Sequence, residues 1–353
     1  MTIQENVPLA PFTTLKVGGP AKYFCVVDST SQLSLALDFA SKENLPILLI
    51  GGGSNIVISD KGWDGLVIKI ELKGIQIVSE NESKITVNVG AGENWDDFVS
   101  WSVKNDLSGI ECLSGIPGTT GSTPIQNVGA YGQEVSETIH RVQVLDVETK
   151  ETRWIINSDC HFSYRNNIFK KNGFGKLIVI SVDFELQQNV FPELRYGELK
   201  REVEDSNISD LPSLRNKVLE IRRRKSMVVD KSDPNSRSAG SFFTNPIVSA
   251  VEFDRFLEIA REMEMEIASI PQYPQEDGKV KLAAGWLIEQ SGFEKGFVFG
   301  NVGLSNKHAL AIINRENGSA LEIFNFAKEI QDAVKMKWGI WLENEPQFIG
   351  DFD

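Results

Sequence analysis

The chain has 353 residues, of which 41% are hydrophobic and 9% aromatic, and its 36 Lys and Arg against 49 Asp and Glu give a formal net charge of −13. This composition predicts a packed globular protein of about two to three domains. The negative charge disfavours binding to nucleic acid or anionic lipid, because both depend on surplus Lys and Arg. No secretory signal or membrane-length apolar stretch is visible, so we expect a cytoplasmic protein without membrane insertion. The three cysteines and three histidines lack metal-binding spacing, and no metal site is expected.

The first part of the chain predicts mostly strands. In chain order, the pattern gives a strand at 23–27, a helix at 31–43, strands at 46–50, 65–70 and 85–89, a helix at 95–104, strands at 142–146, 152–156 and 177–186, and a helix at 211–225. Residues 109–132 are rich in glycine and poor in helix signals, so we expect a long ordered loop there.

A polar segment at 230–238 predicts a domain boundary. Beyond it we expect, in chain order, a strand at 241–243, helices near 251–264 and 281–291, a strand at 309–313, a helix at 320–335 and a strand at 339–342.

Two glycine-rich loops could bring backbone N–H groups close to a phosphate, because glycine adopts positive φ and adds no side chain. Gly51–Asn55 (GGGSN) follows a buried strand but lacks the Lys-Ser/Thr pair of a P-loop, and Gly115–Ser122 (GIPGTTGS) has glycine every third residue and several hydroxyls. Each loop alone is more often a tight turn. Together they favour a dinucleotide with a pyrophosphate, such as FAD.

Two further segments allow more than one interpretation. Arg222–Lys225 (RRRK) is either a solvated helix end, which the helix dipole favours, or a clamp for a diphosphate near the domain boundary. In the segment 238–246, Ser241 could be an exposed nucleophile or an acid. The segment is not a nucleophile elbow and no histidine completes a triad, so a serine hydrolase is disfavoured.

Four motifs occur together and in a fixed order: Gly51–Asn55; Ile116–Gly118 with Gly121–Gly132 (GSTPIQNVGAYG); Tyr164–Arg165; and Ala239–Pro246 (AGSFFTNP). The combination closely resembles the UDP-N-acetylenolpyruvoylglucosamine reductase family, and the string 121–132 is highly specific. The similarity extends from about residue 13 to residue 349. The segment Tyr196–Leu199 (YGEL) resembles the tyrosine loop of the family's type I branch.

The resemblance implies an α+β fold with a two-part FAD-binding region of the vanillyl-alcohol-oxidase-like type, at 1–74 and 75–225. A smaller α/β substrate domain at 226–336 and a C-terminal strand at 337–353 with a catalytic glutamate follow. FAD and NADPH are the implied cofactors, and the implied reaction reduces UDP-N-acetylglucosamine enolpyruvate to UDP-N-acetylmuramate for peptidoglycan synthesis. In this family NADPH reduces FAD, and the flavin then gives hydride to the enol ether.

The flavin is expected to contact mainly the glycine loops. The candidate cofactor-binding residues are Gly51, Gly52, Gly53, Ser54, Asn55, Pro117, Gly118, Gly121, Ser122 and Gly129. Their shared feature is a small side chain or an accessible backbone, which suits the pyrophosphate of a dinucleotide.

Three residues match the family's catalytic groups. Arg165 supplies a permanent charge and a planar fork for the carboxylate beside the enol ether. Ser241 matches the proton donor. Glu345 matches a glutamate that, when protonated, can donate a hydrogen bond to the enolate.

The C-terminal glutamate has an alternative register. The family usually has proline before this residue and a basic residue where Gln347 stands, so Glu343 is a weaker competitor for the role of Glu345. If residues 340–349 form one strand, both glutamates share a face, and alternation does not distinguish them.

The resemblance also predicts substrate-binding residues. Lys225 and Asn245 match the positions that meet the UDP diphosphate. Tyr196 is expected on an exposed segment that closes over the UDP part of the substrate. Tyr273 and Gln290 are further substrate-side candidates.

Two other functions remain open from the sequence. One is an FAD-dependent oxidase of the same fold that passes electrons to oxygen. The other is a nucleotide-sugar-binding regulator that has lost catalysis. The regulator hypothesis predicts that Arg165, Ser241 or Glu345 has been replaced, but all three residues are present.

Overall fold

The computed structural model describes residues 1–171 and 175–353. Within these residues the chain divides into two compact units. Unit 1 comprises Met1–Val7, Ala21–Gly53 and Trp63–Val228, and unit 2 comprises Pro8–Pro20, Ser54–Gly62 and Val229–Asp353. Each unit therefore combines segments that are far apart in the sequence, and the first glycine loop is divided between Gly53 and Ser54.

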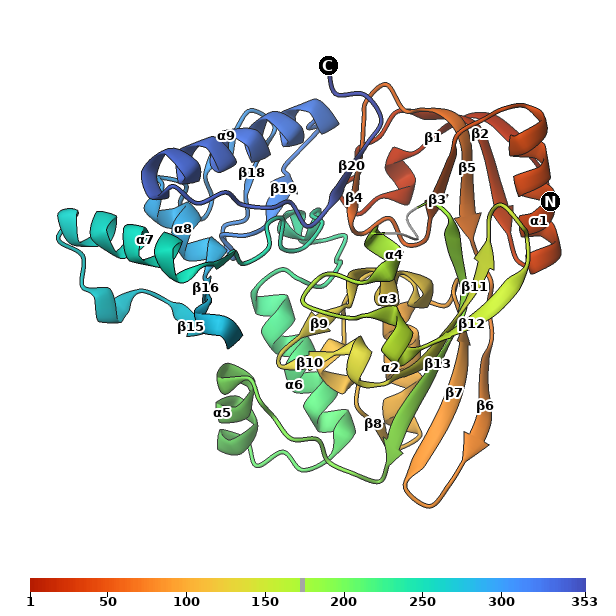
Figure 1. The fold of residues 1–353 in the computed structure, drawn as a ribbon, viewed down its shortest axis with the longest axis horizontal. Coiled ribbons are helices and arrows are strands. Elements are labelled where there is room, and N and C mark those ends of the chain that lie inside the picture. The colour runs from red at the N-terminus through yellow and green to blue at the C-terminus, as the bar shows by residue number, and fades with distance from the viewer. Residues whose placement is uncertain (172–174) are drawn as a thin grey trace. The chain divides into compact units, whose positions relative to one another are not determined.

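Unit 1 begins with a four-stranded sheet in the order β1-β2-β5-β3 (Figure 1). Its strands are β1 (Gln4–Pro8), β2 (Pro20–Val27), β3 (Ile47–Ile50) and β5 (Trp63–Ile70). Strands β2 and β3 both run parallel to β5, which lies between them. Helix α1 (Thr30–Lys42) connects β2 to β3 and buries its apolar stripe, which consists of Leu33, Ala36, Leu37 and Ala40.

A second, antiparallel sheet of unit 1 has the order β12-β11-β13-β7-β6, and β8 also pairs with β13. Its strands are β6 (Ile75–Glu80), β7 (Lys84–Gly90), β8 (Leu107–Ser108), β11 (Ile139–Asp146), β12 (Thr152–Ile156) and β13 (Leu177–Gln188). Residues 178–184 of β13 are all buried, so this central strand is covered on both faces.

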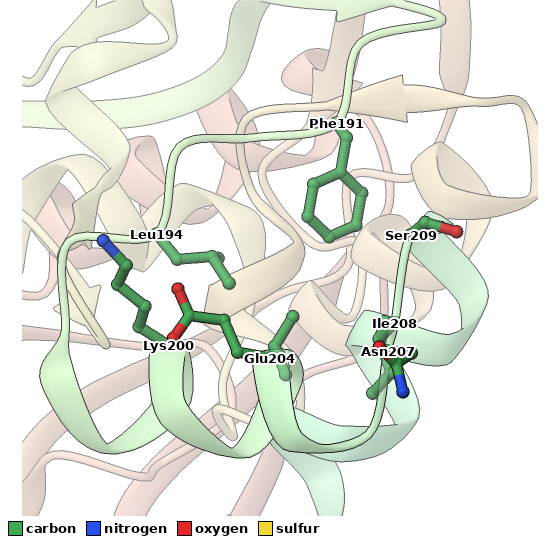
Figure 2. Close-up of a pocket in the computed structure, with 8 residues that line it drawn as sticks. Phe191, Leu194, Lys200, Glu204, Asn207, Ile208 and Ser209 are labelled. Atoms are coloured by element: carbon green, nitrogen blue, oxygen red, sulfur yellow. The ribbon is translucent and has the colours of Figure 1, made fainter.

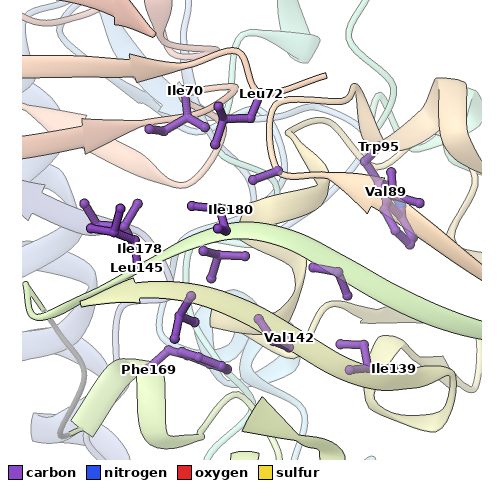
Figure 3. Close-up of a cluster of buried hydrophobic side chains, with 14 of the residues drawn as sticks. Ile70, Leu72, Val89, Trp95, Ile139, Val142, Leu145, Phe169, Ile178 and Ile180 are labelled. Carbon is purple, nitrogen blue, oxygen red and sulfur yellow. The ribbon is translucent and has the colours of Figure 1, made fainter. Parts of the chain in front are cut away.

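The remaining elements of unit 1 are α2 (Trp95–Lys104), α3 (Thr123–Gln126), β9 (Gly129–Ala130), β10 (Gln133–Glu134), α4 (Ile168–Lys171), α5 (Gly197–Asp205) and α6 (Leu211–Arg224). One hydrophobic core joins both sheets, because Leu66 of β5 belongs to the same buried cluster as Val87 and Val182. Figure 3 shows part of this core, including Val89 and Trp95.

Unit 2 packs helices against small sheets. The helices are α7 (Ala250–Glu262), α8 (Ala284–Gln290) and α9 (Ala320–Trp338). The strands are β4 (Ile56–Ile58), β14 (Ile247–Val248), β15 (Gln272–Pro274), β16 (Val280–Leu282), β17 (Val298–Phe299), β18 (Val302–Leu304), β19 (Ile312–Asn314) and β20 (Gln347–Ile349). They form the sheets β14-β16-β15 and β17-β18-β19 and the parallel pair β4-β20. Rings of Phe256, Trp286 and Trp338 meet in the core between the helices.

Short 3₁₀ turns lie between these elements, at Ala10–Phe12, Glu111–Leu113, Thr120–Ser122, Val135–Glu137, Asn157–Cys160, Pro234–Ser236, Ile267–Ser269 and Glu276–Gly278. The predicted loop at 109–132 contains two of these turns together with α3 and β9. The elements predicted before residue 225 are confirmed to within a few residues, and α2 and β12 coincide with the predicted ranges.

The strands predicted at 241–243 and 339–342 are wrong, and the strand predicted at 340–349 is confirmed only at Gln347–Ile349. Within the described residues, the pairing of these two segments is an isolated bridge between Phe243 and Asn344, and a regular strand resumes only at β20. Gly339, with φ of 69°, ends α9 in the left-handed conformation. In the register of that bridge, Pro346 lies opposite Ser241, and proline lacks the N–H that a longer ladder needs.

The helix predicted at 281–291 starts late, and α5 was not predicted. Residues 280–282 form β16 and pair with β15, so α8 begins at Ala284. Helix α5 is strongly charged, and its buried residues are Leu199 and Val203, one turn apart. Two apolar positions give too weak a periodicity to predict a helix.

Candidate active site

The two glycine loops of unit 1 lie against each other. A Cβ atom added to Gly52 would lie 2.6 Å from the Cα of Gly118, and one added to Gly51 would lie 2.3 Å from Oγ1 of Thr119. Gly53 has a φ of 60°, which disfavours larger side chains. The close approach therefore requires glycine at positions 51 and 52 of the first loop, and it brings together two motifs that are about 65 residues apart.

Several polar groups of these loops fit a bound diphosphate. Among the described residues, no acceptor is bonded to the N–H groups of Gly52 and Gly53. Oγ1 of Thr120 is buried there without a hydrogen-bond partner. The hydroxyl of Ser122, in contrast, already has a partner, because its Oγ donates to the carbonyl of Thr119 at 2.6 Å. Free N–H and hydroxyl groups on a glycine loop are the donors that a pyrophosphate needs.

The second glycine loop is joined to α6 by charged side chains that are partly or fully buried. Asp96 accepts hydrogen bonds from both terminal nitrogens of Arg215, at 2.6 and 2.8 Å, and from the N–H of Gly115 at 2.6 Å. Burial raises the pKa of Asp96, but the bonds from Arg215 and Gly115 outweigh it and hold the pKa below its usual value. Arg222 donates to the carbonyls of Met227 and Gly115, at 2.7 and 3.4 Å. The network fixes the loop relative to α6.

Arg165 is held by backbone carbonyls of the specific string at 121–132. Its Nη1 donates to the carbonyl of Asn127 at 2.9 Å, and its Nη2 donates to that of Gly129 at 3.2 Å. Asn127 ends α3 in the left-handed conformation, with φ of 40°, and the β9-β10 hairpin follows. This turn aims both carbonyls at the guanidinium, so the string forms a cradle for Arg165.

Asparagine side chains stabilise this cradle. Nδ2 of Asn127 donates to Glu134 at 2.8 Å and to the carbonyl of Ser163 at 3.2 Å. Nδ2 of the buried Asn167 donates to the carbonyls of Pro124 and Ile125, both at 2.9 Å. The residues around Arg165 are therefore joined to the string at several points.

A second group in unit 1 brings Tyr196 and Lys225 together. Tyr196 precedes α5 and is 42% exposed, and its ring meets that of Tyr131 edge-on with centroids 5.4 Å apart. Nζ of Lys225 lies 5.9 Å from the ring centroid of Tyr131 and 2.5 Å from Oε2 of Glu198. Burial raises the pKa of Tyr131. Sequence reasoning did not assign roles to Tyr131 and Glu198, although both lie inside quoted motifs.

In unit 2 the segments of Ser241 and Glu345 run side by side. The N–H of Glu345 donates to the carbonyl of Phe242 at 2.9 Å, and the N–H of Thr244 donates to the carbonyl of Glu343 at 3.0 Å. Glu345 thus lies beside Phe242, the residue after Ser241, whereas Glu343 lies beside Thr244, two residues further from Ser241. Glu343 is also exposed, and Glu345 is half-buried.

Asn55 belongs to unit 2 and holds the same segment. Its Nδ2 donates to the carbonyl of Glu345 at 3.1 Å, and its own carbonyl accepts from the N–H of Gln347 at 3.1 Å. The contact continues as the parallel pair β4-β20. The structure therefore places Asn55 beside a predicted catalytic residue, and Ser54 lies in the same unit.

The other substrate-side candidates are spread along α8 and β15. Oδ1 of Asn245 accepts from the N–H of Ala284 at the start of α8, at 2.9 Å. Gln290 is the last residue of α8, and its carbonyl accepts a hydrogen bond from Lys337. Because α8 is about 10 Å long, Asn245 and Gln290 lie at opposite ends of it. Tyr273 is half-exposed on β15.

A separate open cavity of about 530 Å³ lies beside α5 (Figure 2). It is lined by Phe191, Leu194, Lys200, Val203, Glu204, Asn207, Ile208 and Ser209. These residues do not include the predicted site residues. Within residues 1–171 and 175–353, no group of His, Cys, Asp and Glu is arranged to hold a metal ion.

No helix in the part of the chain that the structure describes has both the length and the apolar character needed to cross a bilayer.

Comparison with known proteins covers both parts of the chain. Residues 233–349 match the family described as UDP-N-acetylenolpyruvoylglucosamine reductase, C-terminal domain, and residues 21–154 match the FAD binding domain family. The UDP-N-acetylenolpyruvoylglucosamine reductase of Thermobifida fusca (strain YX) is 44% identical over 349 residues, which are 98% of each chain. That of Salinispora arenicola (strain CNS-205) is 42% identical over 97% of this chain and 94% of its own. The crystal structure of the Thermus caldophilus reductase covers 99% of this chain and 100% of its own, with a TM-score of 0.68 at 22% identity, and shares the fold.

Proposed function

This chain belongs to the UDP-N-acetylenolpyruvoylglucosamine reductase family, and we propose how its residues carry out the family's reaction. It is a flavin-dependent UDP-N-acetylmuramate dehydrogenase, which uses FAD and NADPH to reduce UDP-N-acetylglucosamine enolpyruvate to UDP-N-acetylmuramate in peptidoglycan synthesis. The 44% identity to the Thermobifida fusca reductase over 98% of both chains carries this conclusion. The predicted fold, a vanillyl-alcohol-oxidase-like FAD-binding region with a smaller α/β domain, is confirmed.

The paired glycine loops of unit 1 are the proposed site of the FAD diphosphate. The N–H groups of Gly52 and Gly53 and the hydroxyl of Thr120 are suitable donors, as described above. Pro117 and Gly118 lie on the facing loop, and a Cβ atom on Gly52 would collide with the backbone of Gly118. When bound, FAD supplies hydride transfer between NADPH and the substrate.

Arg165 is proposed to stabilise the negative charge that develops on the substrate's carboxylate. Two carbonyls fix the guanidinium, so its charge is oriented before the substrate arrives. A preorganised charge stabilises a transition state more than a mobile one, because no reorganisation is needed during the reaction. Each terminal nitrogen of an arginine carries two N–H groups, so donation to one carbonyl still leaves it a second N–H.

Ser241 is the proposed donor of the proton that completes the reduction, and Glu345 is proposed to donate a hydrogen bond to the enolate. Supporting this pair, the backbone of Glu345 is bonded to Phe242, the residue directly after Ser241. Glu343 remains the alternative carboxyl, but its exposure and its position beside Thr244 make it the weaker candidate.

The proposed substrate-binding residues are Lys225 and Asn245 for the diphosphate, with Tyr196, Tyr273 and Gln290 at the remaining parts of the nucleotide sugar. Oδ1 of Asn245 accepts a hydrogen bond from α8, so its NH₂ group is the part that would donate to the diphosphate. Lys225 supplies the positive charge that a diphosphate needs. We also propose membership of the type I branch, on the basis of Tyr196-Gly197, and a cytoplasmic location.

Spectroscopy of the purified protein tests the function directly. The protein should be yellow, NADPH should bleach it without oxygen, and the enolpyruvyl substrate should restore the colour with formation of UDP-N-acetylmuramate. An FAD-dependent oxidase would instead recover its colour rapidly in air without substrate. A regulator would bind the nucleotide sugar without turnover.

A further inference from the structure

Ion pairs join helices α5 and α6, with the acidic residues on α5 and the basic residues on α6 or directly after it. Glu198, in the first turn of α5, pairs with Lys225 at 2.5 Å. One turn later, Glu202 pairs with Arg224 and lies 3.9 Å from Nζ of Lys217. The two carboxylates therefore contact different cations.

The pair between Glu198 and Lys225 is partly shielded from water. Both side chains are 31% exposed, and the ammonium also lies 5.9 Å from the ring centroid of Tyr131. Lys225 carries one compact positive charge with three N–H donors, one of which meets Glu198, and an incoming diphosphate would be attracted by the same charge. Two anions beside one ammonium repel each other, so the diphosphate and the carboxylate compete.

We infer that Glu198 is a displaceable counter-ion of Lys225, which occupies the diphosphate position before the substrate arrives and is expelled when it binds. The inference rests on the proposed role of Lys225 as a diphosphate ligand. Glu198 thereby lowers the affinity for the nucleotide diphosphate and keeps the ammonium oriented in its absence. It is a positioning residue, since it acts on the substrate through Lys225.

The ion pair between Glu198 and Lys225 also links diphosphate binding to the segment that carries Tyr196. Glu198 lies two residues after Tyr196, and the carbonyl of Tyr196 accepts the N–H of Lys200 within the first turn of α5. Displacement of the carboxylate releases the charged tie between this turn and Lys225. The turn that carries Tyr196 is then held by fewer contacts, and Tyr196 gains freedom to meet the bound nucleotide.

The test compares Glu198→Gln with Glu202→Gln in the FAD-loaded enzyme. The probe is UDP, which carries the diphosphate without the sugar or the enolpyruvyl group, and its Kd is measured by calorimetry. Removing a partly exposed ion-pair partner should lower the Kd of the Glu198→Gln enzyme by about two- to fivefold. Glu202→Gln removes an ion pair between the same helices but does not touch Lys225, so its Kd should equal that of the wild type.

The variant Lys225→Met separates the counter-ion role of Glu198 from the diphosphate role of Lys225, on which it rests. Lys225→Met alone should weaken UDP binding, and in that background Glu198→Gln should have no further effect. If Lys225→Met leaves the Kd unchanged, the diphosphate role of Lys225 is wrong. If Lys225→Met weakens binding but Glu198→Gln does not strengthen it, the counter-ion role alone is wrong. Equal changes for Glu198→Gln and Glu202→Gln would also overturn it, because they would show only that both pairs dock α5.

Discussion

Units 1 and 2 hold their proposed catalytic residues by different means. In unit 1 the functional group itself is fixed, because two backbone carbonyls accept hydrogen bonds from the guanidinium of Arg165. In unit 2 the segments of Ser241 and Glu345 are joined mainly through their backbones, with one long side-chain bond from Oγ1 of Thr244 to the carbonyl of Glu343 at 3.5 Å. The first arrangement immobilises a side chain, and the second immobilises the chain on which the side chains stand.

The difference follows from what each group has to do. A permanent charge stabilises a transition state best when it does not move. A group that transfers a proton must reach hydrogen-bond distance of a substrate atom, so its side chain should remain available for that atom. The comparison predicts that substitutions of Ser241 and Glu345 change the kinetics with little effect on stability, whereas substitution of Arg165 changes both.

Ser241→Ala is the substitution with the largest expected kinetic effect. It should slow reoxidation of the flavin by the enolpyruvyl substrate by about 10²- to 10⁴-fold, the contribution typical of a positioned acid. Reduction of the flavin by NADPH and the melting temperature should be unchanged, because the backbone contacts remain. Stopped-flow absorbance measures the two half-reactions separately.

Thr244→Ala is the matched control for this variant. Thr244 lies three residues further along the same segment, and its Oγ1 is 3.5 Å from the carbonyl of Glu343. This variant should keep both half-reactions. Equal losses in both half-reactions of Ser241→Ala would show that Ser241 has a structural role.

Arg165→Lys keeps the positive charge but cannot reach both carbonyls with a planar fork. We expect substrate-dependent reoxidation to slow by about 10²- to 10³-fold, as for loss of one preorganised donor. Unlike Ser241→Ala, this variant should also melt at a lower temperature, because at least one of the carbonyls of Asn127 and Gly129 loses its donor. Arg153→Lys is the control for replacing an arginine by a lysine, because Arg153 lies on the exposed part of β12. An unchanged melting temperature for Arg165→Lys would contradict the proposed cradle.

The sequence predicts these residues better than it predicts how they are held. Arg165 is found by its motif, but its acceptors are carbonyls of residues 38 and 36 positions earlier. Every residue has a carbonyl, so no residue type marks such a partner in the sequence. Asn55 illustrates the same limit, because its bond to Glu345 spans 290 positions. By contrast, the bounds of α2 could be predicted, since its cap at Asn94 and its apolar periodicity are local signals.

Substitutions of Glu345 and Glu343 test which of the two glutamates is the catalytic carboxyl in unit 2. Glu345→Ala should slow reoxidation by about tenfold or more, the loss of a hydrogen bond to a developing charge. Glu345→Gln should be less damaging, because the amide keeps a donor. Glu343→Ala is the matched control, and we expect it to behave as the wild type, since Glu343 is exposed beside Thr244. The opposite result, with loss of activity only in Glu343→Ala, would shift the register by two residues.

Asn55→Ala should have the smallest effect, and it tests whether the position of the backbone controls catalysis in unit 2. The sequence alone suggests that Asn55 contacts the flavin, whereas the structure shows its Nδ2 donating to the carbonyl of Glu345 at 3.1 Å. Loss of that bond should cost about 1 kcal/mol of stability. It should slow reoxidation only a few-fold, because the bond between Glu345 and Phe242 remains and limits the displacement of Glu345. Flavin content, read from the absorbance of the purified variant, separates the two roles. If the variant keeps its FAD but is reoxidised more slowly, Asn55 positions Glu345. If the variant loses FAD, and the molecules that still hold FAD are reoxidised at the normal rate, Asn55 is a flavin contact.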